Sequence, residues 1–139
     1  MDLFESPAFQ RLERSIDAAV LRQKVIANNI ANADTPYFKR SDVKFEPLLK
    51  KEMESVKAPE ITVTLTHEKH IPIAVNRPQP GTRPEIVTDE TSAMNNNQNN
   101  VDMDYEMALM AKNQLYYNML IQQLNVEFKH LRTAIGGRG

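Results

Sequence analysis

The chain contains no cysteine and no tryptophan, and only four of its 139 residues are glycine. Without cysteine there is no disulfide scaffold, no thiolate zinc site and no cysteine nucleophile. Three of the four glycines lie within the last four residues, which leaves almost none for a phosphate-binding loop. These absences exclude small disulfide-rich proteins and argue against nucleotide-binding enzymes.

Charge of one sign is also missing, because 17 Lys and Arg face 18 Asp and Glu for a formal net charge of −1. A chain without a basic excess lacks the electrostatic footprint of a nucleic-acid-binding protein, so we expect no nucleic-acid partner. No apolar run approaches the roughly 20 residues that cross a bilayer. The first residues also lack the basic and apolar regions of a secretory signal peptide. We therefore expect a cytoplasmic protein, or one exported by a route that reads no cleaved signal.

The remaining composition is that of one ordinary domain, with 41% hydrophobic and 25% charged residues in 15.9 kDa. Seven of the eight prolines lie between residues 33 and 100, so the middle of the chain differs from both ends. We predict an N-terminal helix in residues 1–32, an irregular or β middle in residues 33–100, and a C-terminal helix in residues 101–139. The expected fold class is mainly α, with two long, coiled-coil-like heptad helices around a small middle segment.

The first segment has apolar residues at spacings of three and four, which is typical of a helix with a heptad stripe. Ser6 is the expected N-cap, and Pro7 is the expected first helical residue. The stripe is interrupted only by Gln23 and consists of Phe9, Leu12, Ile16, Ala19, Ile26 and Ile30.

The last segment repeats this pattern for longer. Asp102 is the expected N-cap, and Gly136 with Gly137 ends the helix. A helix of about 34 residues is roughly 50 Å long, which is more than a globule of this mass needs. Its stripe has one polar member, Gln114, and consists of Met103, Met107, Met110, Tyr117, Ile121, Leu124, Phe128, Leu131 and Ile135.

The middle segment carries shorter signals. Alternation in residues 60–66 predicts a strand. Residues 71–75 also alternate, but Pro72 confines that stretch to a sheet edge or to no sheet. The asparagine-rich residues 95–100 are interpreted as a polar linker. One short amphipathic helix is predicted from Phe45, Leu48, Leu49, Met53 and Val56.

Candidate chemistry is weak throughout the chain. His67 and His70 resemble a metal-ligand pair, but residues three apart on a strand point to opposite faces, so a surface turn is favoured. The carboxylates of Asp102, Asp104 and Glu106 are explained by N-capping and by the positive end of the helix. No nucleophile elbow, P-loop or zinc-protease string occurs. We expect no catalytic residue, no metal site, no cofactor and no small-molecule substrate.

The apolar stripes must be buried against a partner, and two arrangements satisfy them. One is an antiparallel two-helix hairpin closed over a small β insert, and the other is assembly with copies of the chain. Gln23 and Gln114 have two interpretations. Either they are lone polar residues in the core that fix the register of the helices, or they are exposed at a gap in the packing. Apolar residues outside the stripes favour assembly, because two helices cannot cover so many sides. They are Val20, Leu21, Val25, Leu109, Leu115, Tyr116, Met119, Leu120 and Val126.

One string is more specific than any periodicity. It resembles the N-terminal motif of the flagellar rod, hook and hook-associated axial proteins, in which an A-N-N-[LI]-A-N block precedes a T-P-[GN]-[YF] turn. Tyr37 stands where that turn usually has a small residue. Short amides followed by a proline also mark a helix end on physical grounds. The motif residues are Ala27, Asn28, Asn29, Ile30, Ala31, Asn32, Thr35 and Pro36.

The resemblance to the flagellar basal-body rod family covers almost the whole chain and is greatest for the proximal rod proteins. It is carried by residues 42–49, 69–71, 100–108 and 131–135. The short middle argues against the distal rod and hook proteins, which have similar ends but carry much larger inserted domains.

This resemblance implies a structural subunit of the bacterial flagellar basal body, in the cell envelope, that the flagellar type III export apparatus exports without a cleaved signal. The implied partners are copies of the chain, other flagellar rod proteins, the rod adaptor protein and the base of the membrane ring. The two apolar stripes would then form the assembly interface. The alternative is a freestanding two-helix adaptor or chaperone that binds an amphipathic partner helix.

Overall fold

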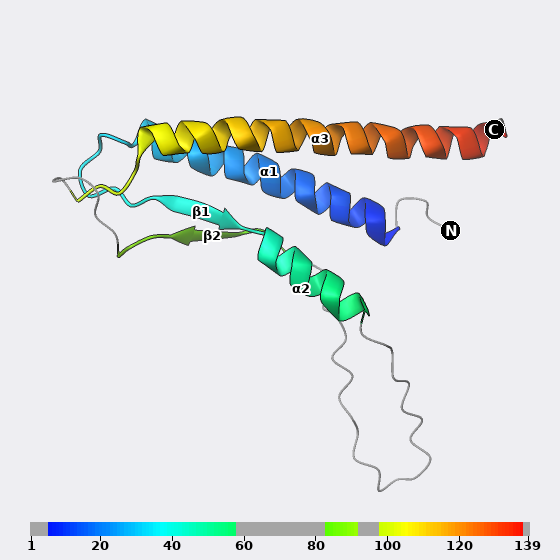
Figure 1. Cartoon of the computed structure of the whole chain (residues 1–139), viewed down its shortest axis with the longest axis horizontal. Helices are drawn as coiled ribbons and strands as arrows, with labels where there is room; N and C mark the ends of the chain where they lie inside the picture. The colour runs from blue at the N-terminus through cyan, green and yellow to red at the C-terminus, as the bar shows by residue number, and fades with distance from the viewer. Residues whose placement is uncertain (1–5, 58–82, 92–97, 138–139) are drawn as a thin grey trace, which may run out of the picture.

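Two long antiparallel helices dominate the computed structural model, which describes residues 6–57, 83–91 and 98–137 (Figure 1). Helix α1 spans Pro7–Ala31, and helix α3 spans Met103–Gly136. They lie side by side, and the C-terminal end of α3 extends past the start of α1. Together with the small sheet described next, they confirm the mainly α fold expected from the sequence. None of the described helices combines the length and apolarity of a membrane span.

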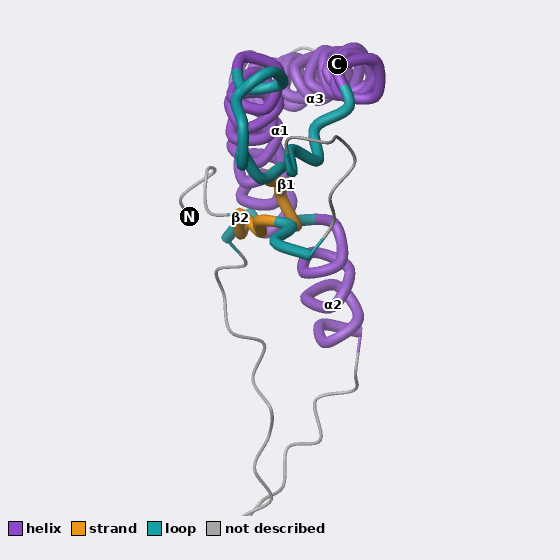
Figure 2. The backbone as a smooth tube through the Cα atoms, turned by 90° about the vertical axis from the view of Figure 1, so that its left-hand side faces the viewer, coloured by secondary structure: helices purple, strands orange, loops and turns teal. Residues whose placement is uncertain are grey.

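A small sheet covers a second side of α1. Strand β1 (Ser41–Lys44) pairs antiparallel with β2 (Glu85–Thr88), with Ser41 opposite Thr88. Seen along the helices, the sheet lies below α1, while α3 lies beside it (Figure 2). Helix α2 (Glu46–Lys57) follows β1 and leads away from the helix pair. Helix α1 is therefore the element against which both α3 and the sheet are placed.

The helix ends are those that the sequence predicts. The Ser6 side chain accepts a backbone N–H of the first turn of α1, and Pro7 is the first helical residue. Asp102 caps α3 in the same way. Gly137 ends α3 in the left-handed conformation, with φ 60°. Helix α1 ends at Ala31, and its C-cap is Asn32, the last residue of the A-N-N-I-A-N block of the family motif.

The hydrophobic interior is small and lies where α1, β1 and the start of α3 meet. Ala18 and Ala19 are almost completely buried in the middle of α1, and their short side chains allow a neighbouring backbone to approach closely. Larger buried side chains, such as Ile26, Val43 and Phe45, lie between α1 and the sheet. The buried apolar residues are Ala18, Ala19, Val25, Ile26, Ala33, Val43, Phe45 and Val101.

The heptad stripe of α3 does not stay on the side that faces α1. Met103 and Met107 are exposed, whereas the polar residues Glu106 and Asn113 are buried. A straight helix turns by about 20° per heptad relative to a strict seven-residue repeat. The first stripe residues therefore lie outside the contact with α1, while Leu124 is half-buried.

Sequence periodicity predicts the middle segment only in part. The short amphipathic helix is confirmed as α2, which starts directly after the buried Phe45. Strands β1 and β2 were not predicted, because four residues each are too few for a clear alternation. The predicted strand at 60–66, the alternating stretch 71–75, and the pair His67 and His70 lie outside the described residues.

Tyr37 occupies a conformation that disfavours side chains. Its φ is 62°, in the left-handed region, and its side chain is 72% exposed. An L-residue in this region carries a steric penalty of about 1–2 kcal/mol that glycine does not. The turn after α1 therefore holds a tyrosine in the left-handed region, at the position where the motif usually has a small residue.

We expect Tyr37→Gly to raise the free energy of unfolding by about 0.5–1 kcal/mol, because relief of the left-handed strain exceeds the extra entropy of glycine in the unfolded chain. The measurement is urea unfolding followed by circular dichroism. Tyr37→Ala is the control, since it also removes the exposed ring but keeps the Cβ atom. Equal stability of the two variants would show that the turn is not strained at this residue.

Candidate functional site

Asn29, in the A-N-N-I-A-N block at the end of α1, holds β1 against this helix. Its side chain is completely buried. Its Nδ2 donates to the carbonyl oxygen of Ser41 at 2.8 Å, and its Oδ1 accepts the backbone N–H of Ser41 at 3.1 Å. The amide thus pairs with one residue of β1 as a neighbouring strand would, which fixes where β1 starts on the helix.

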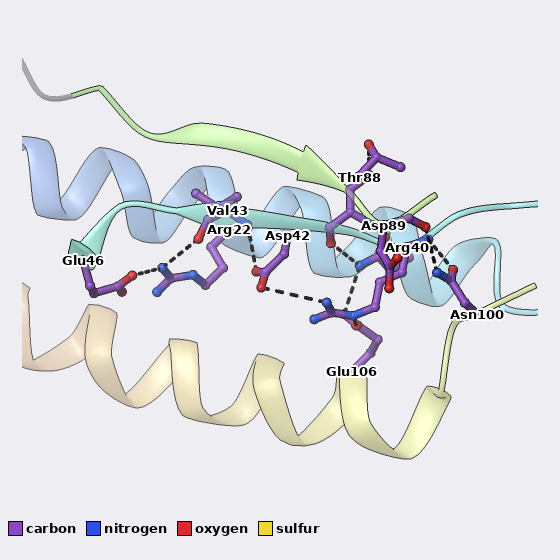
Figure 3. Close-up of polar contacts among 11 residues, drawn as sticks. Arg22, Arg40, Asp42, Val43, Glu46, Thr88, Asp89, Asn100 and Glu106 are labelled. Atoms are coloured by element: carbon purple, nitrogen blue, oxygen red, sulfur yellow. Dashed lines mark hydrogen bonds and ion pairs between the residues drawn. The ribbon is translucent and has the colours of Figure 1, made fainter. Parts of the chain in front are cut away.

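A buried ion pair connects the start of β1 and the end of α1 to α3. Arg40 donates through Nε to Glu106 Oε1 at 2.5 Å, and Asn29 Nδ2 donates to Glu106 Oε2 at 3.2 Å. Glu106 is completely buried, and the Arg40 side chain is 19% exposed. Glu106 lies in the first turn of α3, where the sequence analysis placed it at the positive end of the helix. It is also buried and joins α3 to α1 through Asn29 and to the start of β1 through Arg40, a contact shown in Figure 3.

The Arg40 guanidinium is held in its charged form. Burial opposes the charge, but the hydrogen bond with Glu106 and the nearby carboxylates of Glu106 and Asp42 outweigh it, so the pKa of Arg40 is raised. The ring of Tyr105 adds a cation–π contact, with the guanidinium carbon 5.4 Å from the ring centre. The guanidinium therefore stays charged across the physiological pH range.

Asn99, in the segment that leads into α3, closes the end of α1. Its Nδ2 donates to the carbonyl oxygens of Asn32, Ala33 and Thr35, each at 2.9 Å. Its Oδ1 accepts the N–H of Val101 at 2.7 Å. The carbonyl oxygens of Asn32 and Thr35 also accept backbone N–H groups of the turn, from Thr35 and Phe38. The Asn99 side chain adds a donor to both and supplies one to Ala33, so it ties the turn after α1 together.

Asn100 connects the ends of the two strands. Its Oδ1 accepts the backbone N–H of Arg40 at 2.6 Å, and its Nδ2 donates to the carbonyl oxygen of Asp89 at 2.9 Å (Figure 3). Asn99 and Asn100 are both buried, so at these two positions the polar-linker interpretation is wrong. We call the set formed by Asn29, Asn32, Arg40, Asn99, Asn100 and Glu106 the junction.

The other motif residues support the turn or face outward. Asn32 Nδ2 donates to the carbonyl oxygen of Asn28 at 2.8 Å, and Thr35 Oγ1 donates to Asn32 Oδ1 at 3.3 Å. Ile30 is half-buried. The exposed members are Ala27, Asn28, Ala31, Thr35 and Pro36.

We expect Asn99→Ala to lower the free energy of unfolding by about 2 kcal/mol, because it removes the buried donor of the Ala33 carbonyl oxygen and the acceptor of the Val101 N–H. Urea unfolding measures the change. Asn28→Ala is the matched control, since Asn28 also lies at the end of α1 but is exposed, and we expect it to change stability little. A similar loss in both variants would contradict a special role of the buried amide.

A second buried amide lies farther along the helix pair. Asn113 Nδ2 donates to the carbonyl oxygen of Ala19 at 2.9 Å, which ties α3 to the middle of α1. Gln23 and Gln114 are exposed, so of the two alternatives for these residues the structure shows exposure. Asn113 precedes Gln114 and follows Glu106 by seven residues, and this polar repeat beside the stripe is the sequence signal that could have identified both.

The stripe residues that we predict to form the assembly interface range from buried to exposed. Ala19 and Ile26 are buried, and Phe9 meets Phe128 edge-on with ring centres 6.0 Å apart, so part of each stripe packs within the molecule. The half-buried members are Phe9, Leu12, Ile16, Ile30, Met110, Tyr117, Ile121, Leu124 and Leu131. The exposed members are Met103, Met107, Phe128 and Ile135.

A further apolar surface lies on α3, on the side turned away from α1. Leu115 is 72% and Met119 57% exposed, and Val126 is exposed as well. Helical geometry places these three residues on one side, roughly opposite the buried Asn113. We call them the outer stripe. Among the described residues, no group of three His, Asp or Glu side chains is placed to hold a metal ion.

Comparison with known proteins shows which family the chain belongs to. Residues 17–39 match the family model "Flagella basal body rod protein", and this range contains Asn29 and the turn that leads to Arg40. The flagellar basal body rod protein FlgB of Bacillus subtilis (strain 168) is 36% identical over 137 residues, which cover 99% of this chain and 98% of the relative. FlgB of Borreliella burgdorferi is 36% identical over 122 residues, which cover 88% of this chain and 90% of the relative. FlgB of Escherichia coli (strain K12) is 31% identical over 125 residues, which cover 88% of each chain. The chain belongs to the FlgB family of flagellar basal body rod proteins.

Proposed function

We propose that the chain is a structural subunit of the flagellar basal body rod and that α1 and α3 are its assembly elements. The observation that carries this proposal is the outer stripe, where large apolar side chains lie open on a helix whose opposite side is already packed. An apolar surface of this kind is typical of contact with another protein. Family membership supports a partner among the components of the flagellar basal body, and we propose that it is a rod component.

The junction supports this role by fixing the shape of each subunit. It joins the end of α1, the sheet and the start of α3 through buried hydrogen bonds and one ion pair. Subunits that repeat in an assembly must present the same surfaces at the same angles. We infer that the junction acts as a rigid corner and that the two helices supply the contacts.

The partners in this proposal are copies of the chain, other rod proteins, the rod adaptor protein and the base of the membrane ring. The proposed route to the rod is the flagellar type III export apparatus. The proposal assigns no catalytic, metal-binding or cofactor-binding residue. The charged groups of the junction are engaged with one another and hold the fold together.

Cell fractionation tests the proposal against the adaptor alternative. A structural subunit is expected in purified basal bodies, detected by immunoblot, and to remain there after washing with high salt. An adaptor is expected in the soluble fraction, in a stoichiometric complex with one client. Absence of the chain from basal bodies would contradict the structural role.

A further inference from the structure

A groove of about 540 Å³ lies between α1, β1 and α3. Its volume falls in the range of binding clefts, about 300–1,000 Å³. The half-buried Leu109 and Tyr116 provide apolar surface over the buried Ile26 and Val43. Arg22 with Glu46 forms an ion pair of 2.7 Å at one edge (Figure 3). Open apolar surface in a concave site is suited to bind apolar side chains.

The groove also contains an unused hydrogen-bond acceptor. Asn113 lines the groove and is only 3% exposed, and its Nδ2 is engaged with Ala19. Its Oδ1 has no hydrogen-bond partner in the described part of the chain. Buried acceptors in folded proteins are nearly always paired. This oxygen is enclosed behind the lining of the groove, so an N–H group of an occupant pairs with it only after the neighbouring side chains move aside.

The rim of the groove carries positive charge without a partner. Lys44 on β1 and Lys112 on α3 both line the groove, and neither forms an ion pair within the described residues. The two acidic groups of the rim are already engaged, Glu46 with Arg22 and Asp42 with Arg40. The groove therefore fits an apolar segment that is flanked by carboxylates.

The chain itself contains such a segment at its N-terminus, where Asp2 and Glu5 flank Leu3 and Phe4. We propose that this groove binds residues 2–5 of a neighbouring copy of the chain, with the apolar pair in the groove and the carboxylates against Lys44 and Lys112. The proposal rests on the rod function, because it specifies one contact of the assembly.

The segment of the same molecule cannot reach the groove. Ser6 precedes Arg22 by sixteen residues of continuous helix, which span about 24 Å at 1.5 Å per residue. Phe4 is two residues from Ser6, and two extended residues span only about 7 Å. The contact must therefore form between molecules.

Photo-crosslinking from within the groove identifies the occupant. The full chain is expressed in its own cells with p-benzoylphenylalanine in place of Tyr116, irradiated, and recovered in purified basal bodies. We expect a crosslinked pair of chains in which mass spectrometry finds the groove joined to the tryptic peptide of residues 1–11. Capture of residues 58–82, capture of a different protein, or no capture would overturn the proposal.

Charge reversal tests the two lysines. We expect Lys112→Glu to lower the crosslink yield about fivefold, and Glu5→Lys in the same chain to restore most of it. Lys24→Glu is the control, because Lys24 is exposed on α1 and does not line the groove. Equal yields for Lys112→Glu and Lys24→Glu would overturn the charge pairing.

The same samples separate this inference from the rod function. If immunoblots find the chain in basal bodies but the groove captures nothing, the N-terminal contact is wrong and the rod function stands. If the chain is absent from basal bodies, the rod function fails and the contact fails with it.

Discussion

Glu106→Ala is expected to lower the free energy of unfolding by about 3–5 kcal/mol, the largest effect of any single substitution that we predict. The change leaves the Arg40 guanidinium, which is mostly buried, without its main partner, and it removes one acceptor of Asn29. An uncompensated charge in a buried site costs more than the pair itself contributes. Urea unfolding followed by circular dichroism measures the loss.

Asp42→Asn provides the matched control on the same arginine. Asp42 is 51% exposed and lies 3.8 Å from Arg40, so this substitution is expected to cost less than about 1 kcal/mol. The asparagine keeps the oxygen that accepts the N–H of Val43. Comparable losses in the two variants would mean that burial of Glu106 does not set the strength of the junction.

Leu115→Asp is expected to abolish incorporation into the rod and swimming while leaving the isolated subunit stable. The Leu115 side chain is 72% exposed, so a carboxylate there remains hydrated in the monomer and costs about 0.5 kcal/mol in helix propensity. In an assembled rod the same carboxylate would be buried in an apolar contact without a partner. Because the contact repeats in every subunit, we expect almost complete loss.

The readouts are immunoblots of purified basal bodies and a swimming assay, beside unfolding of the purified variant. Asn125→Asp adds the same charge on the polar side of α3, at an exposed residue next to Val126, and is expected to assemble normally. Normal rods with Leu115→Asp would show that the outer stripe is not covered in the assembly. Failure of Asn125→Asp to an equal degree would attribute the effect to charge alone.

The helices and their caps could be predicted because each depends on local signals. Ser6, Asp102 and Gly137 act within one turn of their own helix, and the apolar repeats extend over about six turns or more. The junction could not be predicted from such signals. Glu106 lies 66 residues after Arg40, and a carboxylate in the first turn of a helix is explained equally well by the helix dipole.

The buried asparagine side chains could not be predicted from local signals either. Asn99 is the fifth residue of a polar run, and only the contact with the end of α1 distinguishes it from a linker residue. The heptad pattern predicted that α3 is packed along its length but not which side faces α1. Asn113, rather than Gln114, faces α1 because a straight helix does not keep a seven-residue repeat on one side.

The central claim is that this chain forms part of the rod through α1 and α3, and electron cryo-microscopy of purified basal bodies tests it most directly. We predict rod density that fits the antiparallel pair of α1 and α3, with Leu115 and Met119 covered by a neighbouring subunit. Density in which the outer stripe faces solvent would contradict assembly through this surface. A rod in which no subunit matches the side chains of this sequence would contradict the claim as a whole.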